Sequence, residues 1–289
     1  MRVRSESGAG ASVKLLPLGV RGSTPAPGAD FVRYGGNTSC VAVSVADGPP
    51  GLLLDAGTGI RRLTGLLGGA AFEGAILLSH LHWDHVQGLP FCPAVDRDDA
   101  IVDLYLPDPG RDARAVLSRA MSPPHFPIDP GGLRGRWRFG VLPPGRTEIG
   151  EVSVLAADIP HKGGRTYGYR LEYGGRSVAY LPDHAPVEGL PAGLLALIGG
   201  VDVLLHDGQF LPSERDTAIA FGHSVVDDAV ALAARAGVGR LVLTHHAPDR
   251  TDDELDALAD HLAGAPLPVS LAAEGAAIPV RGNDPSRVG

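Results

Sequence analysis

The sequence predicts an α/β fold in which two β-sheets pack face to face and helices cover their outer sides. Two observations indicate this arrangement. Short apolar runs bounded by glycine or proline come first along the chain, and further runs then alternate with segments of helical periodicity. The two halves of the chain are similarly built, but there is no internal repeat of roughly 20–50 residues, which excludes a solenoid. We expect a single domain over residues 1–289.

The individual elements follow from local composition. Strands are expected at Val13–Leu18, Cys40–Val45, Leu52–Asp55, Ala75–Ser79, Val102–Leu106, Val152–Ala156, Tyr167–Tyr173, Ser177–Leu181, Val203–Leu205, Arg240–Thr244 and Pro268–Ala272. Helices are expected at Gly57–Leu67, Ala113–Ala120, Leu190–Ile198, Ser224–Ala236 and Asp252–Leu262. Ser224 is a good helix N-cap, since Asp227 follows three residues later. Segment 106–138 contains proline clusters and little periodicity, so we expect a loop or lid insertion that covers a site.

Charge and composition narrow the partners. The formal net charge is −8, and an acidic surface repels polyanions, so long nucleic acid is not an expected partner. No apolar run approaches the roughly 18 residues that span a bilayer, and the N-terminus lacks the apolar core of a signal peptide. We therefore expect a cytoplasmic protein without a membrane partner. Cys40 and Cys92 belong to no CxxC pair, and we expect buried free thiols.

The strongest chemical signal is a histidine-rich segment that directly follows an apolar run. Leu77, Leu78 and Ser79 lead into the pattern His-x-His-x-Asp-His, which consists of His80, His82, Asp84 and His85. In an extended chain residues i and i+2 point the same way, so His80 and His82 can share one metal ion. If a helix starts next, Asp84 and His85 turn toward a second position. Nitrogen and oxygen ligands at this density suit zinc, manganese or iron.

This motif resembles the hallmark of the metallo-β-lactamase superfamily, and is most similar to the branch containing tRNase Z and the phosphonate-pathway cyclic phosphodiesterase. The similarity extends from the turn at 22–24 to residues 273–275 and implies a four-layer αββα sandwich. It implies that His161 is the third histidine of the first metal site and that Asp183 bridges both metals. It also implies that His245 completes the second site, because the family places this ligand directly after the strand; the alternative is the adjacent His246.

The implied site is therefore dinuclear. One ion would be held by His80, His82 and His161, and the other by Asp84, His85 and His245, with Asp183 and a water or hydroxide between them. The expected cofactors are two divalent ions, zinc first, with manganese or iron as alternatives. Such a pair lowers the pKa of a bridging water and stabilises charge on a phosphoryl or carbonyl oxygen, which indicates hydrolysis.

Further residues suggest the substrate class. The segments around His206 and His223 resemble the His-Glu-Ala-Thr and Gly-His-Ser-Thr motifs of tRNase Z, although Asp207 stands where that family has glutamate. We expect His206 to donate a proton to the leaving oxygen and His223 to contact phosphate or orient His206, with two structural histidines as the alternative. Asp55, which ends a strand, resembles an aspartate that orients a metal-binding histidine; a plain helix cap is the alternative.

These features favour a phosphodiesterase acting on a small anionic phosphodiester or nucleotide, with cyclic ones included. The first alternative is a lactonase or thioesterase, which would not need His206 and His223. A tRNA 3′-processing endonuclease would require an arm between His161 and Asp183, yet only 22 positions separate them. A non-catalytic metal-binding module is the last alternative. Homodimers are common among similar proteins, but the sequence identifies no interface.

Overall fold

Two seven-stranded β-sheets form the centre of the structure, a computed structural model that describes residues 12–187 and 189–281. The first sheet has the order β14-β1-β2-β3-β4-β5-β6 and the second the order β13-β12-β11-β10-β9-β8-β7. The first sheet contains β1 (Val13–Gly19), β2 (Cys40–Val45), β3 (Leu52–Leu54), β4 (Glu73–Leu77), β5 (Ile101–Pro107), β6 (Arg136–Leu142) and β14 (Ile278–Val280). The second contains β7 (Gly145–Ile149), β8 (Val152–Ile159), β9 (Thr166–Tyr173), β10 (Arg176–Leu181), β11 (Val203–Asp207), β12 (Leu241–Thr244) and β13 (Val269–Leu271).

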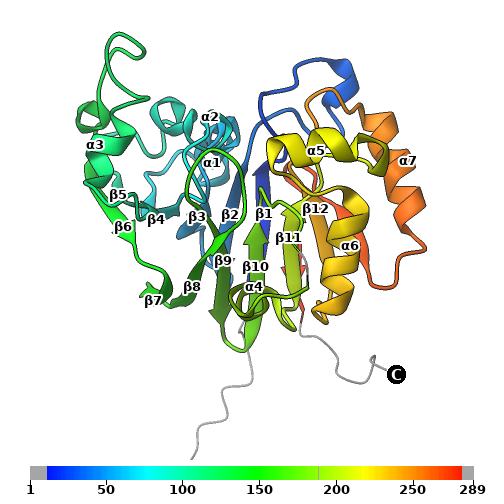
Figure 1. Ribbon diagram of the computed structural model, residues 1–289. Coiled ribbons are helices and arrows are strands. Elements are labelled where there is room, and N and C mark those ends of the chain that lie inside the picture. The colour runs from blue at the N-terminus through cyan, green and yellow to red at the C-terminus, as the bar shows by residue number, and fades with distance from the viewer. Residues whose placement is uncertain (1–11, 188, 282–289) are drawn as a thin grey trace, which may run out of the picture.

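Helices flank the sheet pair on both sides (Figure 1). They are α1 (Leu63–Leu66), α2 (Trp83–Val86), α3 (Ala113–Leu117), α4 (Ala192–Ile198), α5 (Arg215–Phe221), α6 (Val226–Arg235) and α7 (Asp252–Leu262). Short 3-10 helices are η1 (Ala29–Phe31), η2 (Thr58–Arg62), η3 (Leu89–Phe91), η4 (Pro130–Gly132) and η5 (Pro212–Glu214). Within the described residues no helix is long and apolar enough to cross a membrane.

Three apolar layers hold these elements together. Side chains from both sheets, such as Leu54 of β3 and Leu205 of β11, fill the layer between the sheets. A second layer packs Leu63 of α1 against the outer face of the first sheet. A third packs Leu232 of α6 and Leu258 of α7 against the outer face of the second. The expected four-layer αββα sandwich is confirmed.

The strand directions define one functional edge. β3 and β4 are parallel neighbours in the first sheet, and β10, β11 and β12 are parallel neighbours in the second. The carboxyl ends of parallel strands meet at the same edge of a sheet. In Figure 1, α2 and α5 both lie above the upper edge of the two sheets.

All eleven expected strands are present, with small differences at their ends, but other details were wrong. Segment 57–67 forms η2 followed by the short α1 instead of one helix. The N-cap of α6 is Val225, not Ser224, because the Ser224 hydroxyl donates to the carbonyl of His184. Three strands and one helix were not predicted, namely β6, β7, β14 and α5. Cys40 and Cys92 are buried free thiols, as expected, and burial raises the pKa of both.

Candidate metal centre

The loop and helix after β4 separate the local ligands into two groups. His80 and His82 lie in the extended connection after the strand, and α2 begins at Trp83, so that Asp84 and His85 are already helical. The first group contains His80 and His82, and the second contains Asp84 and His85. The change from extended to helical backbone therefore distributes one short motif over two positions, as the sequence predicted.

The first group is completed by residues that are distant in the sequence. His161 follows β8 and Asp183 follows β10. The Nε2 atom of His161 lies 3.3 Å from Nδ1 of His82 and 3.4 Å from Oδ2 of Asp183. Nε2 of His80 lies 3.5 Å from the same carboxylate oxygen. Four ligand atoms thus converge on one position.

The second group is completed by His245, which directly follows β12. Its Nε2 atom lies 3.1 Å from Oδ2 of Asp84, and Nε2 of His85 lies 3.3 Å from that oxygen. The backbone of His245 has φ 59°, a left-handed conformation uncommon outside glycine. The adjacent His246 faces away, and its Nε2 donates to the carbonyl of Ala272. Of the two histidines, the structure brings His245 to the ligand group.

Asp183 lies between the two groups, with one carboxylate oxygen on each side. Its Oδ2 atom is near His80 and His161, whereas its Oδ1 atom is 3.2 Å from Nε2 of His85 and 3.2 Å from Nε2 of His245. This is the geometry that the resemblance implied for a bridging carboxylate.

The donor set fits divalent metal ions. Nε2 of His80, Nε2 of His85 and Oδ1 of Asp183 are buried and make no hydrogen bond within the described residues. Buried polar atoms without hydrogen bonds are costly, and a cation bound between imidazoles and carboxylates would satisfy them. Imidazole and carboxylate together suit zinc, iron or manganese. These buried clusters are of the kind that hold two metal ions.

Without metal, protons compete for these positions. Burial, together with the neighbouring His85, holds the pKa of His80 well below its usual value. Burial alone would also lower the pKa of His85, but the carboxylates of Asp84 and Asp183 raise it well above that value. Burial works to raise the pKa of Asp183, yet the imidazoles of His245 and His85 hold it well below its usual value. Metal binding therefore has to displace protons, mainly from the second group.

Asp55 orients His85 of the second group through a hydrogen bond on the side of the ring that faces away from the metal position. Its carboxylate is fully buried at the end of β3, and its Oδ2 atom accepts hydrogen bonds from Nδ1 of His85 and the hydroxyl of Tyr180, each 2.8 Å long. The Ser79 N–H donates to Oδ1 at 2.6 Å. Because Nδ1 of His85 donates its proton to Asp55, its Nε2 is left as the metal-facing lone pair. This geometry supports the orienting role and not a plain helix cap.

Backbone groups orient two further ligands. The carbonyl of Gly222, which follows α5 with φ 79°, accepts a hydrogen bond from Nδ1 of His161 at 2.8 Å. The N–H of Ser23 donates to Oδ2 of Asp84 at 2.7 Å, and Gln209 donates to the Ser23 hydroxyl at 3.1 Å. Ser23 and Gln209 were not among the site residues predicted from the sequence. The only sequence signal for Ser23 was its place in the glycine-containing turn at 22–24.

The two candidate proton-transfer histidines have different surroundings. His223 lines the metal cavity, and its Nδ1 atom donates to the Asp207 carboxylate at 2.7 Å, which leaves Nε2 for a ligand. A ring nitrogen of His223 lies within 4.8 Å of ligand atoms of Asp183 and His245. His206 is fully buried, does not line the cavity, and bonds His184 at 3.0 Å and the backbone carbonyl of Asp207 at 2.9 Å. This position gives no support to the prediction that His206 donates a proton to substrate.

The two groups of metal-ligand residues, called the metal groups below, open into a cavity of about 540 Å³. Its lining includes Ser23, Leu81, His82, Trp83, Asp84, His161, Asp183, Gln209, Phe210, Thr217, Phe221, His223 and His245. No residue of segment 106–138 belongs to this lining, so the expected lid has no contact with the cavity in this structure. The carbonyl of Asp108, which belongs to this segment, accepts a hydrogen bond from Arg165 at 3.1 Å.

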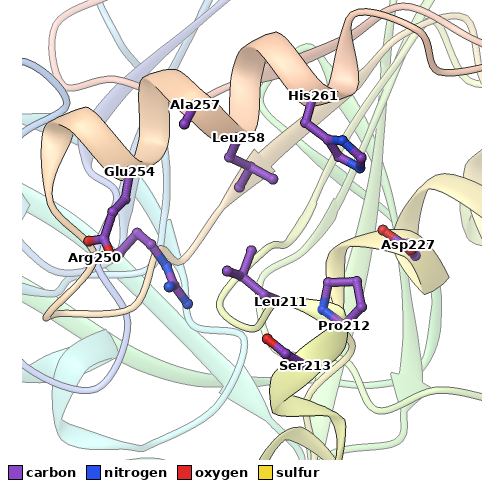
Figure 2. Close-up of a pocket in the computed structure, with 9 residues that line it drawn as sticks. All are labelled: Leu211, Pro212, Ser213, Asp227, Arg250, Glu254, Ala257, Leu258 and His261. Carbon is purple, nitrogen blue, oxygen red and sulfur yellow. The ribbon is translucent and has the colours of Figure 1, made fainter.

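A second cavity of about 510 Å³ lies between η5 and α7 (Figure 2). Leu211 and Pro212 face Leu258 and His261 across it, and Arg250 lies at one end. The Arg250 guanidinium is paired with Glu214 at 2.6 Å. The groups that could ligate a metal in the described part of the chain all lie at the first cavity, which is therefore the candidate active site.

The chain is similar in sequence to a known protein family. The family model of the beta-lactamase superfamily domain matches residues 52–246. Ribonuclease Z of Mycolicibacterium paratuberculosis (strain ATCC BAA-968 / K-10) is 32% identical over 226 residues, which cover 68% of this chain and 75% of that protein.

Solved structures share the fold. The metallo-beta-lactamase fold protein YhfI from Bacillus subtilis superposes with a TM-score of 0.70 at 20% identity, covering 92% of this chain and 99% of that chain. A diphosphatase from the PhnP family superposes with a TM-score of 0.68 at 20% identity, covering 92% of this chain and 97% of that one. With the family match and the ligand geometry, these findings lead to one conclusion: the chain belongs to the metallo-β-lactamase superfamily.

Proposed function

We propose that this protein is a phosphodiesterase that hydrolyses a small anionic phosphodiester at two divalent metal ions, with zinc as the resident metal. The observation that carries the proposal is the position of His223 in the metal cavity, where Asp207 holds its Nδ1 atom at 2.7 Å. The similarity to ribonuclease Z, an enzyme named for cleaving RNA, supports phosphodiester chemistry.

The metal ions, when bound, would supply the Lewis acidity that activates water and stabilises negative charge on phosphoryl oxygens. His80, His82 and His161 would hold one ion and Asp84, His85 and His245 the other, with Asp183 shared. As the bond from phosphorus to the attacking oxygen forms, the bond to the leaving oxygen breaks, and that oxygen needs a proton. His223 would donate this proton from Nε2, since Asp207 holds Nδ1.

This assignment gives His223 the role that the sequence analysis gave to His206. The Asp207 carboxylate orients His223 and balances the positive charge of a protonated imidazole. Burial works to raise the pKa of Asp207, but His223 keeps it below its usual value, so Asp207 stays ionised near neutral pH. We propose that His206 acts only in positioning, through its bond to His184.

A small substrate fits the chain better than structured RNA. The interval between His161 and Asp183 is occupied by β9 and β10, which are joined by a tight turn at Gly174 and Gly175 and leave no room for an arm. The net charge of −8 opposes binding of a long polyanion.

The test compares substrates and leaving groups. Metal-loaded protein is assayed with four substrates. Two are phosphodiesters: bis(p-nitrophenyl) phosphate, whose leaving group is nitrophenolate, and a second one whose leaving group is an alkoxide. The other two are a lactone and a thioester. We expect turnover of both phosphodiesters, and a loss of about 10²- to 10⁴-fold in kcat for His223→Ala with the alkoxide leaving group. The loss should be smaller for the nitrophenolate, which leaves without a proton, and His206→Gln should retain activity with both.

Two results would contradict the proposal. Turnover of only the lactone or thioester would identify a different hydrolase of the same fold. An equal loss in His223→Ala for both phosphodiesters would show that His223 does not donate a proton to the leaving oxygen.

A further inference from the structure

The entrance of the metal cavity carries aromatic side chains that are unusually exposed. Trp83 is 74% exposed and Phe221 is 59% exposed, and both line the cavity that contains the metal groups. Phe210 lines the same cavity, and its ring centroid lies 5.6 Å from that of His223. We call these three residues, Trp83, Phe210 and Phe221, the aromatic rim.

The backbone ties the rim to the metal ligands. Trp83 is the first residue of α2 and stands between the ligands His82 and Asp84. Because Asp84 is turned toward the metal groups while the Trp83 side chain is mostly in solvent, the indole stands at the cavity mouth. Phe221 ends α5, directly before Gly222, whose carbonyl orients His161.

The ammonium group of Lys162 lies near the Phe221 ring. Nζ of Lys162 lies 5.9 Å from the centroid of the Phe221 ring and donates to the carbonyl of Ala220 at 2.7 Å. The cavity therefore presents flat apolar faces beside the metal ligands, whereas Lys162 places its positive charge against the Phe221 ring and does not itself line the cavity. Aromatic faces hold nucleobases by stacking, and they do so with little preference for the base.

We propose that the aromatic rim binds the base of a small nucleotide, whose phosphate lies at the metal groups, and that Trp83 is the main stacking residue. The phosphate end of this inference rests on the proposed function, whereas base stacking on Trp83 does not. A saturated lactone or an alkyl phosphodiester has no flat ring for these faces, so the rim favours nucleotides as the substrate class.

Fluorescence gives a binding test that is independent of turnover. The chain has two tryptophans, and Trp137 is in β6, where it stacks on Phe139 with centroids 5.7 Å apart. A Trp137→Phe protein therefore leaves Trp83 as the only tryptophan. Metal-loaded Trp137→Phe is titrated with adenosine 5′-monophosphate and, separately, with inorganic phosphate. We expect saturable quenching with the nucleotide and little change with phosphate.

Affinity measured by calorimetry provides the matched control. Trp83→Ala should weaken binding of adenosine 5′-monophosphate about 10- to 100-fold, the usual effect of removing a stacking residue, and leave phosphate binding unchanged. Phe91→Ala removes another exposed ring. Phe91 is 57% exposed, packs against Phe126 and does not line the cavity. It should bind the nucleotide as the parent protein does.

Equal nucleotide affinity in Trp83→Ala and the parent protein would overturn the proposal. It would also be overturned if the parent were a dimer in solution and Trp83→Ala a monomer with unchanged nucleotide affinity, because the rim would then be an interface between two copies of the chain. Trp83-dependent nucleotide binding without phosphodiester hydrolysis would contradict the proposed function alone. Phosphodiester hydrolysis with no effect of Trp83→Ala on nucleotide binding would contradict the rim alone.

Discussion

Asp55→Asn is expected to weaken metal binding although Asp55 is not itself a metal ligand. Three donors point at Oδ2 of Asp55, each at 2.8 Å: Nδ1 of His85, the hydroxyl of Tyr180 and the hydroxyl of Ser79. A fourth, the N–H of Ser79, points at Oδ1. Asparagine has nearly the same shape and tolerates the φ of 60° at this position. Its amide, however, has one acceptor oxygen and one donor nitrogen, so at least one of these four donors would face an N–H group.

The magnitude follows from the lost hydrogen bonds. A hydrogen bond to a charged group contributes about 1.5–3 kcal/mol, and the amide leaves at least one buried donor unpaired, so the metal-free protein should lose about 1.5–3 kcal/mol of unfolding free energy. A neutral amide oxygen holds Nδ1 of His85 more weakly than the carboxylate does, so Nε2 of His85 is less firmly fixed as its lone pair. Residues that orient a metal ligand in this way typically change metal affinity by about 10- to 100-fold.

The assay is competition for zinc with a chromophoric chelator, alongside urea unfolding of the metal-free protein. Tyr180→Phe is the matched control, because it removes one hydrogen bond to Asp55 but leaves the carboxylate on His85. It should lower stability without changing zinc affinity. If Asp55→Asn lost stability but bound zinc as tightly as the parent, the carboxylate would only hold its turn and the orienting role would be refuted.

Three further predictions follow from the structure. Gly22→Ala should weaken metal binding at the second group by about tenfold, because a Cβ at this position would lie 2.4 Å from the His245 ring. Gly65→Ala is the control, since its Cβ would meet nothing within 4 Å, and it should leave metal binding unchanged. The same chelator competition compares the two variants. Chelation should lower Tm by about 10 °C relative to protein with metal at a thousandfold excess over Kd, as read by calorimetry, and an unchanged Tm would mean that no metal is bound. The metal-free protein should lose stability as pH falls from 6.5 toward 4, since burial lowers the pKa of His246 to about 4 and only the unfolded chain gains that proton. Urea unfolding should show up to about 1.4 kcal/mol per pH unit from this residue, and His246→Gln should have a shallower slope.

The part of the site that is local in sequence could be predicted from physical patterns. Leu77 to His85 contains an apolar strand end, an extended stretch and a helix start, and these alone divide the ligands into two groups. His161, Asp183 and His245 are different, because only the ends of β8, β10 and β12 bring them together. Their assignment came from resemblance to the family, since each alone is also a common loop residue.

The orientation of His206 could not be read from the sequence. Neighbouring residues of a strand point to opposite faces, so His206 and Asp207 cannot both face the cavity. All five residues of β11 are buried, and the strand therefore has no polar face that would mark the outside. In the structure Asp207 faces His223, and His206 faces His184.

Helix α5 was missed for a related reason. It has seven residues, of which only Ala218 is buried, so it lacks the apolar stripe that identifies most helices. In the sequence the end of α5 is marked by Gly222, which takes φ 79° in the structure. Strand β6 did carry an alternating pattern in Trp137, Phe139 and Val141, which the sequence analysis overlooked.

The most direct test of the account is a stepwise metal titration of chelator-treated protein, with bis(p-nitrophenyl) phosphate hydrolysis measured at each step. We expect two zinc ions to bind per chain and activity to require both, because Asp183 places one carboxylate oxygen at each ligand group. Asp183→Asn should bind less metal and lose activity. Full activity after one equivalent, or two bound ions with no phosphodiester hydrolysis, would contradict the account.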